Sequence, residues 1–258
     1  DMNISSTNEK TLLVVGTHGD EPIGPALLKR LFNQSVPTPF FESVIGNPRA
    51  LAQNKRFTEV DLNRVAPGDA KSTVYEVRRA FELVGLFRKF DYVIDFHETR
   101  ANDRIVAIIP RLTRKSLALA LAFHIEEILI WPPSNVSSGP LVQYASSGIE
   151  IECGTKSSFE RTLKNLTGIT AEFLNNGLLN VKDKLSLPVV RSRQRKFYLV
   201  YGRIEPQEVT GITLQDFGEV NTGQEKFTAL LFGKHQGLTG YKMRHLGIEE
   251  VLAMAGCR

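Results

Sequence analysis

Short apolar runs alternate with amphipathic stretches along the first two thirds of the chain. The apolar runs are rich in β-branched residues, which predicts strands, while the stretches between them repeat their apolar positions with a helical period. This alternation is typical of an α/β fold in which helices flank a mixed central sheet. The expected strands are 11–15, 40–45, 92–96, 104–109, 128–131 and 148–153, and the expected helices are 22–32, 73–89, 112–124 and 158–179.

The pattern changes after the pair Leu187-Pro188. Beyond it the apolar runs are short, glycine turns separate them, and no long helical period follows. We therefore expect two domains: an α/β domain over residues 1–187 that carries the candidate chemistry, and a small β-rich domain over residues 188–258. The strands expected in the second domain are 196–204, 211–214, 227–233 and 238–243.

Two of the predicted strands lead into a histidine. The run 11–15 continues into Gly-Thr-His-Gly-Asp-Glu, which holds His18 and Glu21, and the run 92–96 continues into His97. Open α/β sheets place their ligand crevice at the carboxyl ends of strands. A His-x-x-Glu pair with one distant histidine gives three zinc ligands and an open fourth position, which is typical of catalytic zinc. We predict that His18, Glu21 and His97 bind one zinc ion per chain.

Composition narrows the choice of ligands and partners. With 258 residues, 42% of them hydrophobic, the chain can bury a full core. Its only cysteines are Cys153 and Cys257, which excludes a cysteine-rich metal site, so histidine and carboxylate must hold the metal. The net charge of +4 favours anionic substrates but is small for a nucleic-acid-binding protein. No apolar run approaches the roughly 20 residues that span a bilayer.

These features predict a cytoplasmic protein with a small-molecule substrate and with neither nucleic acid nor membrane as a partner. The polar start of the chain lacks the apolar core of a secretion signal, which supports the same expectation. The sequence leaves open whether the chain forms homo-oligomers.

Further polar residues suit a hydrolytic site beside the metal. Arg56 can supply a cation for a developing oxyanion, and Asn63 with Arg64 can anchor a substrate carboxylate. In the run 148–153, strand alternation puts Glu150 and Glu152 on one face. Glu152 stands at the carboxyl end, where it can take a proton from the attacking water and return it to the leaving nitrogen. Glu150 is the alternative for that role.

Together these motifs resemble the aspartoacylase and succinylglutamate desuccinylase family, a branch of the zinc carboxypeptidase fold. The resemblance covers roughly residues 11–155 and extends more weakly into the C-terminal region. It implies a zinc carboxypeptidase-like catalytic domain that hydrolyses an N-acyl amino acid to a free amino acid and a carboxylate. The motifs that carry it are Gly-Thr-His-Gly-Asp-Glu at 16–21, Asn-Pro-Arg-Ala at 47–50, Arg56 with Asp-Leu-Asn-Arg at 61–64, Asp-Phe-His at 95–97 and Glu-Cys-Gly at 152–154.

The resemblance also implies a role for each residue. His18, Glu21 and His97 bind the zinc ion. Glu152 is the general base and later the acid, and Arg56 polarises the scissile carbonyl. Asn63 and Arg64 bind the carboxylate of the amino-acid part of the substrate.

Two departures from the family pattern bear on the substrate. Aspartoacylases carry an arginine shortly before the catalytic glutamate and a tyrosine pair in the C-terminal region. Here the stretch 140–147 contains no arginine, and Gly-Leu-Thr at 237–239 occupies the tyrosine position. We therefore expect a substrate other than N-acetylaspartate, namely a different or less polar N-acyl amino acid.

Two other functions compete with deacylation. A zinc carboxypeptidase that cleaves short peptides would use the same site residues, so it is the alternative that the sequence leaves open. A protein that only binds an acylated metabolite is expected to have lost a ligand or the base, and none is lost here.

Overall fold

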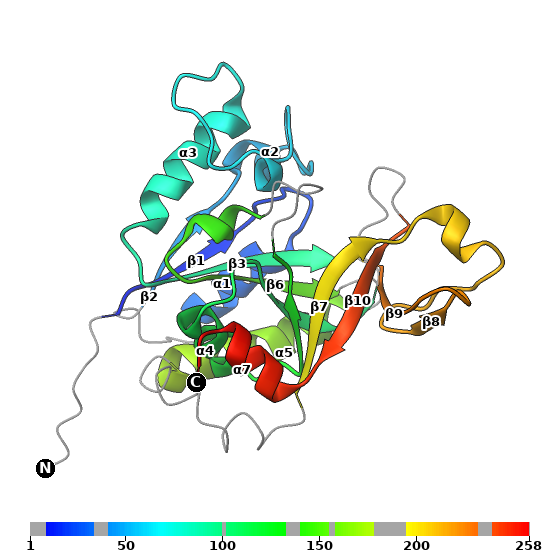
Figure 1. Cartoon of the computed structure of the whole chain (residues 1–258). Coiled ribbons are helices and arrows are strands. Elements are labelled where there is room, and N and C mark those ends of the chain that lie inside the picture. The colour runs from blue at the N-terminus through cyan, green and yellow to red at the C-terminus, as the bar shows by residue number, and fades with distance from the viewer. Residues whose placement is uncertain are drawn as a thin grey trace, which may run out of the picture.

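A ten-stranded mixed sheet forms the centre of the computed structural model, which describes residues 9–33, 41–99, 102–132, 140–154, 158–177, 195–231 and 239–257 (Figure 1). The strand order is β2-β1-β3-β6-β4-β5-β7-β10-β9-β8. The strands are β1 (Thr11–Val15), β2 (Phe41–Ile45), β3 (Tyr92–Thr99), β4 (Ile105–Ile109), β5 (Glu127–Ile130), β6 (Gly148–Gly154), β7 (Lys196–Arg203), β8 (Glu219–Asn221), β9 (Lys226–Leu230) and β10 (Tyr241–Leu246).

Helices cover both faces of this sheet. The apolar sides of α1, α4, α5 and α7 share one core cluster, whereas α3 packs with η2 and η3 in a second cluster on the other face. The predicted fold class, an α/β protein whose mixed central sheet is flanked by helices, is confirmed. The helices are α1 (Ile23–Asn33), α2 (Pro48–Ala52), α3 (Tyr75–Phe87), α4 (Arg114–Ala122), α5 (Phe159–Glu172) and α7 (Ile248–Met254), with the short helices η2 (Leu62–Arg64), η3 (Leu141–Tyr144), η4 (Phe173–Gly177) and η7 (Pro206–Val209).

Strand β1 shows why a continuous apolar run forms a strand here. All five of its residues are buried, because β1 pairs in parallel with both β2 and β3 and both of its faces are covered. Leu13 and Val15 enter the cluster beneath α1 and α5, while Leu12 and Val14 enter the cluster beneath α3. Thr11, at the start of β1, is its one polar residue.

The neighbouring strands β3 and β6 bring charged and polar side chains to the α3 face. Val93 of β3 packs in the α3 cluster, and strand alternation puts Asp95 and His97 on the same face. The parallel register pairs Asp95 with Glu150 and His97 with Glu152. Sheet pairing therefore gathers two acidic side chains of β6 next to the polar residues of β3.

The C-terminal strands extend the same sheet. β7 pairs in parallel with β5, β10 pairs antiparallel with β7, and β9 and β8 follow at the edge. The expected domain boundary after residue 187 lies outside the described residues, and the division into two domains stays a prediction. The expected strand 211–214 is wrong: its residues Ile212 and Leu214 pack against a small cluster without pairing.

Each strand and helix expected before residue 187 is present, with ends that differ by a few residues. The short elements that were not predicted are α2, β8 and α7 and the short helices η2, η3 and η7. β3 runs on to Thr99, so His97 lies within a strand rather than after one. Residues 40, 178–179, 232–233 and 238, which fall in expected elements, lie outside the described residues. In the described ranges no helix combines the length and the hydrophobicity needed to cross a bilayer.

The loop after β1 packs tightly against α2, and this contact can be tested at Gly19. A Cβ atom on Gly19 would lie 2.1 Å from the carbonyl carbon of Ala50. Because that backbone cannot yield without a shift of the loop or of α2, we expect Gly19→Ala to lower the free energy of unfolding by about 1–3 kcal/mol in urea titrations.

A matched glycine serves as the control. Gly85 is exposed in the interior of α3, and a Cβ atom there meets nothing within 4 Å. Gly85→Ala should raise the free energy of unfolding by about 0.5–1 kcal/mol, because alanine is the better helix former. Wild-type stability in Gly19→Ala would contradict the described packing.

Candidate active site

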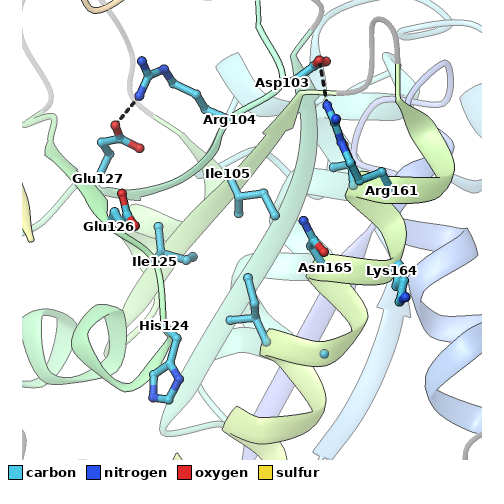
Figure 2. A pocket seen from close by; sticks show the side chains of 13 residues that line it. Asp103, Arg104, Ile105, His124, Ile125, Glu126, Glu127, Arg161, Lys164 and Asn165 are labelled. Carbon is cyan, nitrogen blue, oxygen red and sulfur yellow. Dashed lines mark hydrogen bonds and ion pairs between the residues drawn. The ribbon is translucent and has the colours of Figure 1, made fainter. Parts of the chain in front are cut away.

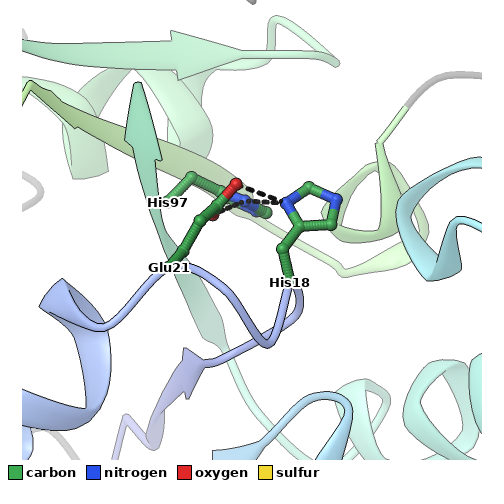
Figure 3. A group of neighbouring side chains, drawn as sticks. All are labelled: His18, Glu21 and His97. Carbon is green, nitrogen blue, oxygen red and sulfur yellow. Dashed lines mark hydrogen bonds and ion pairs between the residues drawn. The ribbon is translucent and has the colours of Figure 1, made fainter. Parts of the chain in front are cut away.

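The three residues predicted to bind zinc meet at the carboxyl ends of β1 and β3 (Figure 3). The two strands are parallel neighbours, so the loop after β1 and the end of β3 share one edge of the sheet. His18 and Glu21 belong to that loop, where the Glu21 N–H donates to the His18 carbonyl at 3.4 Å. His97 is held by the strand itself.

The donor atoms of this group converge on one point. Glu21 places Oε1 2.8 Å from His18 Nδ1 and Oε2 3.1 Å from His97 Nδ1, and the two Nδ1 atoms are 3.3 Å apart. Two imidazole nitrogens on one tetrahedral zinc ion, each at about 2.0–2.1 Å, would be separated by about 3.3–3.4 Å. All three side chains are buried. The residues therefore fit a zinc ion in both the type and the spacing of their donor atoms.

Carboxylates lie behind both imidazole rings. His18 Nε2 is 3.1 Å from Asp61 Oδ1. His97 Nε2 is 3.0 Å from Asp95 Oδ2 and 3.3 Å from Glu150 Oε1, although neither contact has the alignment of a hydrogen bond. A carboxylate in this position keeps the proton on the outer nitrogen and leaves the inner nitrogen free to bind a cation. Both rings are thus oriented with Nδ1 toward the shared centre.

The buried carboxylates also dominate the electrostatics of the centre. Burial alone would lower the pKa of both histidines, but the carboxylates raise the pKa of His18 above its ordinary value and that of His97 well above it. Burial alone would raise the pKa of Glu21, but the two histidines hold it well below its ordinary value. A centre that favours positive charge on its imidazoles also favours a divalent cation between them.

Asp61 and Asp95 are residues of this site that the sequence analysis did not single out. Asp95 accepts a hydrogen bond from the Thr17 hydroxyl at 2.9 Å. Its position two residues before His97 on a strand was a usable signal, since such residues share a face. Asp61 caps η2 and lies 43 positions from His18 in the chain. No local pattern connects these two residues, so only the fold reveals their contact.

The guanidinium of Arg56 reaches the same centre from the segment before η2. Its Nη1 donates to Glu21 Oε1 at 3.2 Å, and its Nε and Nη2 donate to Asp61 Oδ2 at 3.3 and 3.2 Å. The Arg56 carbonyl accepts a hydrogen bond from the Gly19 N–H at 3.3 Å, which ties this segment to the loop after β1. Because 23% of the Arg56 side chain is exposed, part of the cation is accessible to a ligand.

Asn63 and Arg64 occupy different depths. Asn63 is buried, its Nδ2 donates to Glu150 Oε1 at 2.7 Å, and its Oδ1 accepts the Leu141 N–H at 2.7 Å. Arg64 is exposed, and its Nη1 donates to the Asn63 carbonyl at 2.8 Å. The structure therefore brings Asn63 into the buried cluster and leaves Arg64 at its surface.

The two glutamates of β6 differ in their surroundings. Burial raises the pKa of Glu152 to about 7, and the carboxylates of Glu21 and Glu150 act in the same direction. Burial would also raise the pKa of Glu150, but contacts with His97 and Asn63 lower it below its ordinary value. A carboxyl group with a pKa near neutrality can both accept and release a proton at the pH of a cell.

A cavity of about 530 Å³ lies on the opposite face of the sheet (Figure 2). Ile105 lines it and pairs with Cys153, whereas Glu152 pairs with Val106 and points to the other face. Ion pairs within the protein occupy much of its charged lining, including Arg161 with Asp103. None of the predicted site residues lines this cavity.

Comparisons with curated proteins identify related sequences. A "Probable aspartoacylase" of Nostoc sp. (strain PCC 7120 / SAG 25.82 / UTEX 2576) is 35% identical over 113 residues, which span 39% of this chain and 38% of that protein. A "Probable aspartoacylase" of Prochlorococcus marinus (strain MIT 9301) is 28% identical over 80% of this chain and 75% of its own length. The "N-acyl-aromatic-L-amino acid amidohydrolase (carboxylate-forming)" of Homo sapiens is 28% identical over 54% of this chain and 51% of its own length.

Solved structures share the fold. Murine aminoacylase 3 superposes with a TM-score of 0.72 at 17% identity, covering 93% of this chain and 96% of that chain. The succinylglutamate desuccinylase from Chromobacterium violaceum superposes with a TM-score of 0.63 at 17% identity, covering 93% of this chain and 86% of that chain.

The family model of the succinylglutamate desuccinylase/aspartoacylase catalytic domain matches residues 7–176. This range contains every residue that the sequence analysis predicted for the site. The resemblance seen in the sequence motifs is confirmed, and the chain belongs to the succinylglutamate desuccinylase/aspartoacylase family.

Proposed function

We propose that the protein is a zinc-dependent deacylase that hydrolyses the amide bond of a small N-acyl amino acid. The observation that carries this proposal is the convergence of His18, Glu21 and His97 on one buried centre next to Glu152. Membership of the family supports the reaction class. On composition alone we also propose a cytoplasmic location and neither a nucleic acid nor a membrane as partner.

His18, Glu21 and His97 would hold one zinc ion, which when bound makes water more acidic and polarises a carbonyl group. Glu152 then takes a proton from the attacking water and delivers it to the leaving nitrogen, for which a pKa of about 7 is well suited. The Arg56 guanidinium stabilises the negative charge that develops on the scissile carbonyl oxygen.

Asn63 and Arg64 would bind the α-carboxylate of the substrate. Asn63 has one Nδ2 hydrogen left after its bond to Glu150, and Arg64 adds a cation from the surface. With its α-carboxylate held by Asn63 and Arg64, the substrate would be oriented so that its amide bond faces the proposed metal centre.

The residues of β4 that lie next to Glu152 and Glu150 favour a substrate without an acidic side chain. On β4, Val106 pairs with Glu152 and Ile108 pairs with Glu150. Both residues belong to an apolar cluster with Tyr198, and no arginine occurs in the stretch 140–147. An acidic side chain would find apolar neighbours there rather than a cation, which disfavours its burial.

A substrate panel tests the proposed function as a whole. We expect hydrolysis of N-acetyl, N-formyl or N-succinyl derivatives of amino acids with apolar side chains, at a kcat/KM at least about tenfold above that for N-acetylaspartate. Dipeptides belong in the same panel, because the alternative, a zinc carboxypeptidase, would cleave them at the higher rate. Hydrolysis of none of these compounds would refute the deacylase.

Metal removal tests the proposed ligands. Dialysis against a chelator should abolish hydrolysis, and one equivalent of Zn²⁺ should restore it. Because zinc binds the folded state only, its loss should also lower the free energy of unfolding, by about 2.7 kcal/mol if free zinc had stood at 100 times its Kd.

His97→Ala should lose the stoichiometric metal in elemental analysis. His124→Ala, which changes a histidine outside the metal group, should keep it; equal metal content in both variants would contradict the assignment.

Substitution of the proposed base gives a separate test. Glu152→Gln should reduce kcat by about 10²- to 10⁴-fold, because the amide cannot accept the proton, while the zinc content persists. Glu42→Gln makes the same chemical change at an exposed position of β2 and should leave kcat at the wild-type value. Wild-type turnover in Glu152→Gln would refute its role as the base.

A further inference from the structure

Glu150 is a buried carboxylate that the proposed reaction does not use. Only 5% of the residue is exposed, and it lies two positions before Glu152 on the same face of β6. Its Oε1 atom lies 2.7 Å from Asn63 Nδ2 and 3.3 Å from His97 Nε2. One oxygen atom therefore touches both a proposed substrate anchor and a proposed metal ligand.

On the Asn63 side, the contact fixes which end of the amide faces the substrate. The Leu141 N–H can only donate, so it must meet Asn63 Oδ1. The Glu150 carboxylate can only accept when ionised, so it must meet Nδ2. With both ends determined, Asn63 offers a bound carboxylate its remaining N–H and not its carbonyl oxygen.

On the His97 side, Glu150 adds a second anion to the one supplied by Asp95. Asp95 and Glu150 are direct neighbours across the β3–β6 pairing, and both approach Nε2. Asp95 is itself held by the Thr17 hydroxyl. Two anions behind the ring keep its proton on Nε2 and increase the attraction of Nδ1 for a cation.

We propose that Glu150 is a positioning residue that couples the substrate anchor Asn63 to the metal ligand His97. This inference rests on the function proposed above, because that function assigns both partners their roles. In this role Glu150 would bind neither the substrate nor the zinc ion held by His18, Glu21 and His97; it would align the groups that do. A carboxylate that merely filled space would be replaceable by glutamine without effect on either group.

The first test measures zinc affinity without turnover. Metal-free protein is titrated with Zn²⁺ in competition with a chromophoric chelator. Glu150→Gln keeps the size of the side chain and removes its charge, and we expect the zinc affinity to fall by about 10- to 100-fold. The matched control is Glu127→Gln, which neutralises another buried carboxylate of the sheet, in this case one paired with Arg104. It should bind zinc with wild-type affinity.

The second test measures the coupling to Asn63 at saturating zinc. The probes are the N-acetyl amino acid that the wild type hydrolyses fastest and its carboxamide, which lacks the α-carboxylate. Glu150→Gln should raise KM by about tenfold for the acid and not for the carboxamide. In the Asn63→Ala background the same change should have no further effect on KM, because the anchor that Glu150 aligns is gone.

These measurements separate failure of the inference from failure of the proposed function. Wild-type zinc affinity in Glu150→Gln, or additive KM effects in the double variant, would overturn the coupling while deacylation stands. If the wild type hydrolyses none of the compounds, the deacylase is refuted, and the zinc titration of Asn63→Ala decides the coupling. Without its donor the Glu150 carboxylate can turn away from His97, so zinc affinity should fall several-fold; an unchanged affinity overturns the proposal.

If Glu150→Gln does not fold, as shown by the lack of a cooperative unfolding transition, the zinc titration of Asn63→Ala tests the proposal in its place. The Asn63 side chain reaches the proposed metal ligand His97 through Glu150, whereas the Asn63 backbone N–H, which donates to Asp61 Oδ1, is retained in Asn63→Ala. A change in zinc affinity on removal of Asn63 is therefore a result that simple packing around Glu150 would not produce.

Discussion

The burial of several carboxylates around two imidazoles is the constraint on which the rest of this site depends. Glu21, Asp95 and Glu150 are all nearly inaccessible to solvent, as are His18 and His97. Charged groups are removed from water at a high free-energy cost unless opposite charges or hydrogen bonds compensate them. The fold meets this requirement locally, with a hydroxyl, an amide and a guanidinium as donors to the carboxylates. A divalent cation at the centre would add the remaining positive charge.

The sheet makes such a polar cluster tolerable because it confines the polar side chains to one face and one end. Residues 12–15 of β1 are apolar on both faces, so the strand that anchors the His18 loop is held by packing and by its pairing with β2 and β3. β3 keeps Ile94 and Phe96 in the core beneath α1, while its other face becomes polar from Asp95 onward. The polar residues of β3 and β6 are therefore surrounded by core that does not depend on them.

The parts of the fold that local patterns determine were predictable from the sequence. β1 and the first half of β3 are mostly apolar runs, and inspection of the residues after these runs identified His18, Glu21 and His97. α2 and β8 were missed because five or three residues are too few to show a period. The segment at Ile212 was mistaken for a strand because an apolar pattern reports burial and not pairing.

The carboxylates behind the two histidines come from segments that are distant in the sequence. Local sequence patterns do not show which distant segments lie together. The contact of Asp61 with His18 requires that two loops meet. The position of Glu150 behind His97 requires the parallel register of β3 and β6. A shift of that register by one residue would turn Glu150 and Glu152 to the opposite face.

The two glutamates of β6 illustrate how surroundings assign different tasks to one residue type. They share a strand face, and Glu150 is the more buried of the two, yet the pKa of Glu150 is lowered and that of Glu152 is raised to about 7. The difference follows from their neighbours: Glu150 has the Asn63 amide and the His97 ring as partners, whereas the neighbours that act on Glu152 include two further carboxylates. A carboxylate held ionised by donors is suited to fixing other groups in place, and one with a pKa near neutrality is suited to moving a proton. The roles proposed for the two residues, positioning for Glu150 and proton transfer for Glu152, therefore follow from where the sheet register places each of them.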